Sequence, residues 1–203
     1  MVIPPEFQTW GSVPPDWFID PMMEHLARGY YVGLLTAAAF HGAAHQQPQV
    51  FQVVVNKHLA DRDYGRAHLR FMVSDRVPQM DVERRHTHTG TFNLATRETT
   101  LVDMAWRPQA SGGISNVATV AREIGPLDGE RIARLAMVRN RATARRLGWL
   151  LEQFRQDVDR HWLRVVARTD EGDATLLGPG EPKRGRTDRL WGVVVNTQVD
   201  VDL

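Results

Sequence analysis

The sequence of 203 residues contains no cysteine. A chain without thiols forms no disulfide, has no thiolate nucleophile and offers no cysteine ligand to zinc. Its composition fits a reducing compartment. No stretch reaches the roughly 20 apolar residues that a membrane-spanning helix requires, and the first residues lack the basic start and apolar core of a signal peptide. We therefore expect a cytoplasmic protein that makes no contact with a membrane.

An excess of charge of either sign is also lacking. Lys and Arg together number 25 and Asp and Glu 24, which gives a formal net charge of +1. A chain that binds nucleic acid over much of its surface carries a larger positive excess, so any DNA contact here would need a local basic surface. The length suits one globular domain that buries roughly 70% of the surface of the unfolded chain.

The order of apolar patterns predicts the fold class. Residues 1–15 contain four prolines and are expected to form an extended N-terminal arm, which leaves 16–203 as the folded domain. A short helix is expected over 21–28, where Pro21 occupies the first helical position. Residues 30–40 are apolar on every face, which favours a buried helix.

The next segments are rich in β-branched residues. Residues 50–56 and 66–73 are separated by the polar stretch DRDYG and predict a hairpin. The further elements expected are a strand over 82–96 folded at Thr89–Gly90, a helix over 97–106, helices from 113 to about 167, and a closing strand over 189–196. This order predicts a single α+β domain, in which a helical bundle packs on a mixed β-sheet.

Two histidines, His41 and His45, lie four residues apart after the apolar run. This spacing puts two side chains on one face of a helix, as in zinc proteases with an H-E-x-x-H motif. Gly42 stands where such enzymes carry the glutamate base, and glycine weakens a helix. His86 and His88 are the nearest further candidates for ligands. We favour a scaffold role and predict no metal site, with zinc as the alternative.

Short motifs of several enzyme classes are missing. The sequence has no G-x-S-x-G nucleophile elbow, no P-loop, no G-x-G-x-x-G opening a helix and no catalytic loop of protein kinases. The segment GPGEPKRGR (178–186) places glycine amides beside Lys183, Arg184 and Arg186. Such a loop can cradle phosphate, and a solvated connection has the same composition, so both interpretations stay open.

The basic run RNRATARR (139–146) holds four arginines in eight residues. On a helix, Arg141, Arg145 and Trp149 follow one another at intervals of four and share one side. Tryptophan beside arginine is typical of the centre of a binding interface. The alternative is a solvated face on which Trp149 is half-buried against another element. The first interpretation makes Arg141 and Trp149 candidates for contact with a partner.

One carboxylate, Asp103, lies inside the apolar helix expected over 97–106. A buried carboxylate must be paired or hydrogen-bonded. Asp103 therefore either bonds a neighbouring element or serves a site as a base or a magnesium ligand.

Four segments together resemble AbiEi-type antitoxins, which are the protective halves of bacterial toxin–antitoxin pairs usually grouped as type IV. The segments are YYVGLLTAAAFHGAAHQQPQVFQVVV (30–55), RETTLVDMAWRPQASGGISNVATVARE (97–123), RRLGWLLE (145–152) and WGVVVNTQVDVDL (191–203). The likeness runs from about residue 4 to the end. It implies that 16–203 is an AbiEi-like antitoxin domain, that HGAAHQQPQV belongs to the scaffold, and that the partner is a cognate toxin with a nucleotidyltransferase fold.

The resemblance also bears on DNA and on phosphate. Longer relatives usually carry an N-terminal winged helix that binds the operator, and because none precedes WGSVPPDWF here, we expect no DNA partner. The sequence is similar to a short branch described as atypical serine kinases, which implies ATP with Mg²⁺ as the phosphate donor. On that hypothesis, the positive charges that bind the triphosphate are those of Lys57, Arg145, Lys183 and Arg184. Asp103 is then the catalytic carboxylate, as a base or as a metal ligand.

Three functions remain open at this point. The first is an antitoxin that phosphorylates a toxin serine, which adds roughly −1.5 to −2 of charge and would repel an incoming triphosphate. The second is a non-enzymatic antitoxin that binds and occludes the toxin. The third is a DNA-binding autoregulator that uses RNRATARR and the KRGR loop on phosphates.

Overall fold

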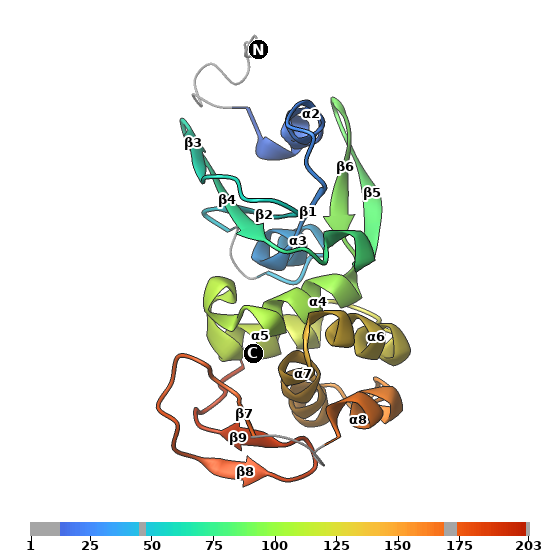
Figure 1. The fold of residues 1–203 in the computed structure, drawn as a ribbon, viewed down its shortest axis with the longest axis vertical. Helices are drawn as coiled ribbons and strands as arrows, with labels where there is room; N and C mark the ends of the chain where they lie inside the picture. The colour runs from blue at the N-terminus through green and yellow to red at the C-terminus, as the bar shows by residue number, and fades with distance from the viewer. Residues whose placement is uncertain (1–12, 45–47, 169–173, 202–203) are drawn as a thin grey trace.

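Three layers follow one another along the long axis of the molecule in a computed structural model (Figure 1). A six-stranded sheet forms one end, helices form the middle, and a three-stranded sheet forms the other end. The structure describes residues 13–44, 48–168 and 174–201. Most of the expected N-terminal arm, residues 1–12, lies outside the described residues. The α+β class expected from the sequence is confirmed.

The larger sheet is mixed and has the strand order β3-β4-β2-β1-β6-β5. Its strands are β1 (Tyr30–Val32), β2 (Phe51–Val55), β3 (Arg62–Tyr64), β4 (Ala67–Val73), β5 (Val82–Thr87) and β6 (Gly90–Ala95). The antiparallel pairing of β5 with β6 confirms the fold-back expected near Thr89–Gly90.

The hairpin expected between 50–56 and 66–73 is wrong. β2 and β4 pair in parallel, with Phe51 opposite Leu69, and the antiparallel partner of β4 is β3. β3 is short and all three of its residues are exposed, so it carries no apolar alternation that would reveal it among the polar residues of DRDYG. Apolar runs locate strands, but they do not choose partners or direction.

The buried helix expected over 30–40 is only partly correct. β1 takes up the first three residues, and after Gly33 the chain continues as α3 (Leu34–Phe40). Both parts are largely buried. A continuous apolar run fits a central strand as well as a buried helix, because both are covered on all sides.

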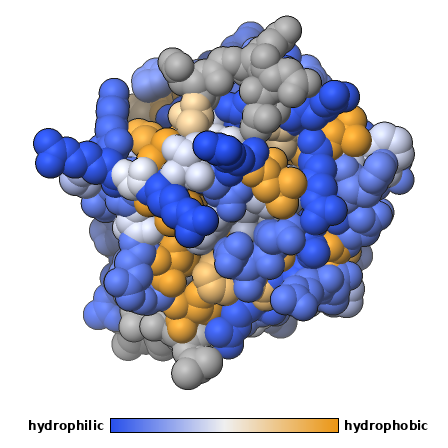
Figure 2. All heavy atoms as spheres, turned by 90° about the horizontal axis from the view of Figure 1, so that it is seen from below, coloured by the Kyte–Doolittle hydropathy of each residue, from blue (hydrophilic) through white to orange (hydrophobic). Residues whose placement is uncertain are grey.

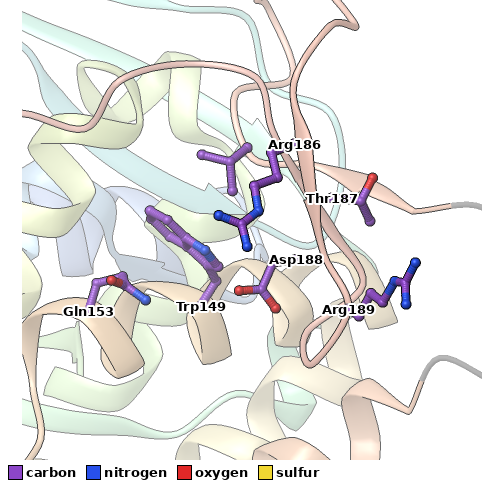
Figure 3. A pocket seen from close by; sticks show the side chains of 7 residues that line it. Trp149, Gln153, Arg186, Thr187, Asp188 and Arg189 are labelled. Carbon is purple, nitrogen blue, oxygen red and sulfur yellow. The ribbon is translucent and has the colours of Figure 1, made fainter.

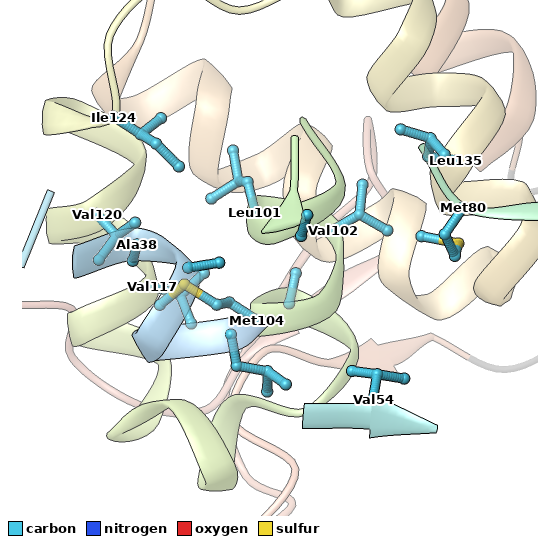
Figure 4. Close-up of a cluster of buried hydrophobic side chains, with 14 of the residues drawn as sticks. Ala38, Val54, Met80, Leu101, Val102, Met104, Val117, Val120, Ile124 and Leu135 are labelled. Atoms are coloured by element: carbon cyan, nitrogen blue, oxygen red, sulfur yellow. The ribbon is translucent and has the colours of Figure 1, made fainter. Parts of the chain in front are cut away.

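The middle layer surrounds α4 (Arg97–Trp106), which begins where the Thr96 side chain accepts a hydrogen bond from the Thr99 amide. This helix confirms the expectation for 97–106, and most of its residues are buried. Figure 4 shows its apolar side chains meeting those of α3, β2, α5 and α6. The other α-helices among the described residues are α2 (Ile19–His25), α5 (Gly113–Glu123), α6 (Gly129–Arg139), α7 (Arg141–Phe154) and α8 (His161–Ala167). None of the described helices is long and apolar enough to cross a membrane.

The smaller sheet has the order β7-β9-β8. Its strands are β7 (Thr175–Leu176), β8 (Arg186–Asp188) and β9 (Val193–Val195). The closing strand expected over 189–196 is therefore shorter and belongs to a second sheet. β8 lies at one edge of that sheet and forms one wall of the surface described below.

An ion pair attaches α2 to the larger sheet. Arg84 of β5 donates from Nη2 to Oδ2 of Asp20 at 2.8 Å, and the Tyr30 hydroxyl donates to Oδ1 of the same carboxylate at 2.5 Å. The hydrogen bond from Arg84 is the largest of the effects that hold the pKa of Asp20 below its usual value. The carboxylate form is therefore more favourable in the folded chain than in the unfolded chain.

We expect Asp20→Asn to lower the free energy of unfolding near neutral pH and to lose that effect in acid. A carboxylate with a lowered pKa stabilises the fold above its unfolded value of about 3.9, and the contribution disappears as the pH falls through the folded value. Urea titrations of both proteins between neutral pH and pH 3 measure the difference. Asp75→Asn, at an exposed pair with Arg76, is the control, and an Asp20 effect that persists unchanged in acid would contradict the expectation.

Candidate functional site

A cleft of about 750 Å³ opens between α7 and the edge strand β8. Its lining comes from both elements and from β9: Trp149, Gln153, Arg186, Thr187, Asp188, Arg189 and Val195. Figure 3 shows these side chains around the cleft. The cleft joins a predicted partner residue of α7 to the end of the glycine-rich loop GPGEPKRGR.

A close contact between α7 and the smaller sheet creates this cleft. Gly148 faces the ring of Trp191, and a Cβ atom at position 148 would lie 2.0 Å from two of the ring carbons. Trp191 is completely buried. Because only glycine permits this approach, Gly148 sets how closely β8 and β9 lie against the helix, and the next residue, Trp149, is brought to the rim.

Polar and aromatic groups face one another across the cleft. Trp149 is half-buried and packs edge-on against Phe154, with 6.4 Å between ring centroids. Arg186 and Asp188 point towards Trp149, whereas Thr187 lies on the other side of the strand (Figure 3). This arrangement follows from the alternation of side chains along a strand.

Several of the cleft's polar groups have no partner among the described residues. The side chains of Arg186 and Gln153 make no hydrogen bond or ion pair there. Asp188 uses Oδ1 to accept a hydrogen bond from the Trp191 amide at 3.1 Å, which fixes the carboxylate at the mouth of the cleft. These three side chains are available to a ligand.

The arginines of RNRATARR are largely structural. Arg145 is 4% exposed and donates to the carbonyl groups of Ala167 and Arg168, at 3.2 Å each, at the end of α8. Burial is the main cause that lowers the pKa of Arg145. Arg146 donates from Nε to the carbonyl of Leu176 at 2.9 Å, and burial lowers its pKa to about 10. The expectation that Arg145 shares an exposed side of α7 with Trp149 is therefore corrected.

Arg139, the first arginine of RNRATARR, has a buried side chain and pairs with Asp103. Arg139 donates to Oδ1 of Asp103 from Nη2 at 2.7 Å and from Nε at 2.8 Å, and the two side chains are 1% and 0% exposed. The Tyr31 hydroxyl donates to Oδ2 of Asp103 at 2.7 Å. Arg139 also reaches Ser74 and Tyr31 and lies 4.1 Å from the ring centroid of Trp106.

This network decides between the two interpretations of Asp103 on geometric grounds. Burial raises the pKa of Asp103, while Arg139 and Tyr31 act in the opposite direction. Burial also raises the pKa of the Tyr31 hydroxyl well above its usual value, so Tyr31 remains a donor. Both carboxylate oxygens are engaged inside the protein, as a buried charge requires.

The residues predicted to bind phosphate do not converge. Lys57 is exposed in the segment that follows β2, at the end of the molecule that holds the larger sheet. Lys183 and Arg184 are exposed in the loop before β8, at the other end of the molecule (Figure 1). Arg145 is engaged with α8. Lys183 and Arg184 alone lie close in sequence to the cleft, a few residues before Arg186.

The two residues predicted to contact a partner also separate. Trp149 lines the cleft, and Arg141 is exposed at the first position of α7. Arg139, Arg145 and Arg146 are bonded within the fold, so they add little to the basic surface that the DNA hypothesis draws from RNRATARR.

The histidine pair behaves as part of the scaffold where it is described. His41 ends α3, and its Nε2 lies 2.8 Å from the carbonyl oxygen of Ala95. His45 lies outside the described residues. Within 13–44, 48–168 and 174–201, no group of three or more His, Asp or Glu side chains could hold a metal ion.

Sequence reasoning placed Arg186 only in the possible phosphate-cradling loop GPGEPKRGR, and it missed Asp188 and Gln153 as site residues. The signal that was available is the alternation of Arg186 and Asp188 directly after the glycine-rich loop, which places both on one side of a strand. Their position opposite Trp149 depends on the contact between Gly148 and Trp191, which no local pattern encodes.

Comparison with known proteins identifies the family. A model of the AbiEi antitoxin C-terminal domain matches residues 31–153, which is more than half of the chain. The chain therefore belongs to the AbiEi antitoxin C-terminal domain family. The matched segment contains most of the larger sheet and the helices α3 to α7.

A solved structure has a similar fold. The RV2827C protein from Mycobacterium tuberculosis superposes with a TM-score of 0.64 at 15% identity, over 90% of this chain and 68% of that one. At this identity the likeness concerns the fold alone. No curated protein matches the sequence.

We expect Asp103→Asn to lower the free energy of unfolding by about 3–5 kcal/mol, because the Arg139 charge would remain buried without its counter-charge. Chemical denaturation measures the loss. The double variant Asp103→Leu/Arg139→Met removes both charges and should recover much of it. A change at an exposed pair, Asp75→Asn beside Arg76, should have a far smaller effect, and equal losses at the two sites would refute the buried-pair account.

We expect Gly148→Ala to destabilise the protein by about 1–3 kcal/mol, because the added methyl group overlaps the ring of Trp191. A second change, Trp191→Leu, removes the overlapping atoms. The effects of the two changes should therefore be non-additive in a double-mutant cycle. Thermal unfolding of the four proteins measures the coupling, and strict additivity would show that the contact is not responsible.

Proposed function

We propose that this chain neutralises a cognate toxin of the nucleotidyltransferase fold, as the antitoxin of a toxin–antitoxin pair. The observation that carries the proposal is the match of residues 31–153 to the AbiEi antitoxin domain. The expected cytoplasmic location belongs to the same proposal.

The first mechanism we propose is phosphoryl transfer from ATP to a serine of the toxin. The serine oxygen attacks the γ-phosphorus, the bond from that phosphorus to the β–γ bridging oxygen breaks, and ADP leaves while the hydroxyl proton is released to solvent. Mg²⁺ bound with ATP would neutralise charge that develops on the phosphate oxygens. Such a metal is held by one or two carboxylates together with the phosphates.

A second mechanism, occlusion of the toxin by binding, has a specific observation in its favour. The predicted catalytic carboxylate, Asp103, is fully engaged with Arg139 and Tyr31. The end of the molecule formed by the smaller sheet and α8 carries apolar groups among polar ones (Figure 2). Trp162, Val165 and Leu190 are between 44% and 55% exposed there, and such side chains suit contact with another protein.

The dose of antitoxin separates the two mechanisms. Tested with its cognate toxin, a kinase should protect at a small molar fraction of the toxin and only in the presence of ATP. It should also add the mass of a phosphate to the toxin. An occluding antitoxin should protect only near equal molar amounts, without ATP, and should leave the toxin mass unchanged. Residual toxin activity and intact mass are the measurements. Failure of any dose to protect would refute the proposed function.

A further inference from the structure

The cleft between α7 and β8 has the chemistry of a nucleotide site, and we infer that it binds a nucleoside phosphate. The base would lie on Trp149 and the phosphate groups on Arg186. This inference rests on the phosphoryl-transfer form of the proposed function and deepens it, since it names where the phosphate donor is held. It also replaces the dispersed set of Lys57, Arg145 and Asp103 with side chains that face one another.

Trp149 provides a platform on which a base can stack. Trp149 is presented by a helix that Gly148 fixes against the buried Trp191, and Phe154 supports the indole from its edge. Stacking on an aromatic side chain accepts any base, because every base has a π-face. A volume of about 750 Å³ falls within the range of roughly 300–1,000 Å³ that is usual for small-ligand pockets.

Arg186 provides the positive charge for the phosphate groups. Arg186 makes no hydrogen bond or ion pair with the described residues, although its side chain points into the cleft (Figure 3). A guanidinium binds phosphate through two parallel hydrogen bonds. Lys183 and Arg184 stand exposed in the loop that leads into β8 and extend the positive charge outward, where the distal phosphates of a triphosphate would lie.

The other polar side chains of the cleft favour a nucleotide over other anions. Asp188 and Gln153 also line the cleft, and the carboxylate of Asp188 has one oxygen beyond the one that accepts from the Trp191 amide. A carboxylate can only accept hydrogen bonds, so it suits an amino group on the edge of a base. A bare phosphate or an acidic peptide would gain nothing from Asp188 and would be repelled by it.

The experiment is calorimetric titration of the purified full chain, without toxin, with three probes: ATP with Mg²⁺, adenosine, and inorganic tripolyphosphate. We expect one ATP to bind per chain. Trp149→Leu keeps an apolar side chain against Phe154 and should weaken ATP and adenosine binding by about tenfold or more. Arg186→Ala should weaken ATP and tripolyphosphate binding by a similar factor and leave adenosine binding unchanged.

Two matched variants outside the cleft serve as controls. Trp162→Leu changes an exposed tryptophan of α8, and Arg85→Ala changes an exposed arginine of β5; both should bind ATP as the parent does. The site is refuted if ATP does not bind, or if Trp149→Leu and Arg186→Ala bind it as tightly as the controls. If ATP fails to bind while the chain still neutralises the toxin, the cleft assignment falls and the antitoxin function stands. If ATP binds as expected but no dose of the chain protects against the toxin, the cleft assignment stands and the antitoxin function falls.

Discussion

The buried pair of Asp103 and Arg139 is the interaction on which the arrangement of the layers depends. Arg139 is the last residue of α6, Asp103 lies on α4, and Tyr31 and Ser74 bring in β1 and the segment after β4. Two charges removed from water are tolerable only when each is paired and its remaining hydrogen bonds are satisfied. The larger sheet and the helical layer must therefore meet in one orientation.

The position of α7 follows from that pair. Asn140 comes directly after Arg139 and caps α7 by accepting a hydrogen bond from the Thr143 amide, so the start of the helix is fixed by the end of α6. Gly148 then brings the smaller sheet against the helix, and Trp149 reaches the cleft. The buried ion pair is thus connected, through the end of α6 and the start of α7, to the helix that carries Trp149 into the solvent-facing cleft.

Elements marked by nearby residues were predictable from the sequence, whereas pairings and burial set by distant contacts were not. The helix 97–106 was predictable because the spacing of apolar residues changes at Arg97 and Pro108 follows shortly after the last helical residue. The partner of β2 was not predictable, since the choice between β4 in parallel and a hairpin depends on contacts made across the whole sheet. Arg145 was misplaced for a similar reason: residue type suggested solvent, and the carbonyl groups of α8 that bury it lie more than 20 residues away in the chain.

The sequence by itself determined the absence of thiol chemistry, the near-neutral charge, the α+β class and the resemblance to AbiEi antitoxins, because composition, local periodicity and short segments encode each of these directly. The tertiary structure decided that Asp103 is a buried ion-pair partner, that most of RNRATARR supports the fold, and that Trp149 meets Arg186 and Asp188. Each of these outcomes requires groups that are distant in the sequence to come within hydrogen-bonding or van der Waals distance. Only the packing of the folded chain brings them together.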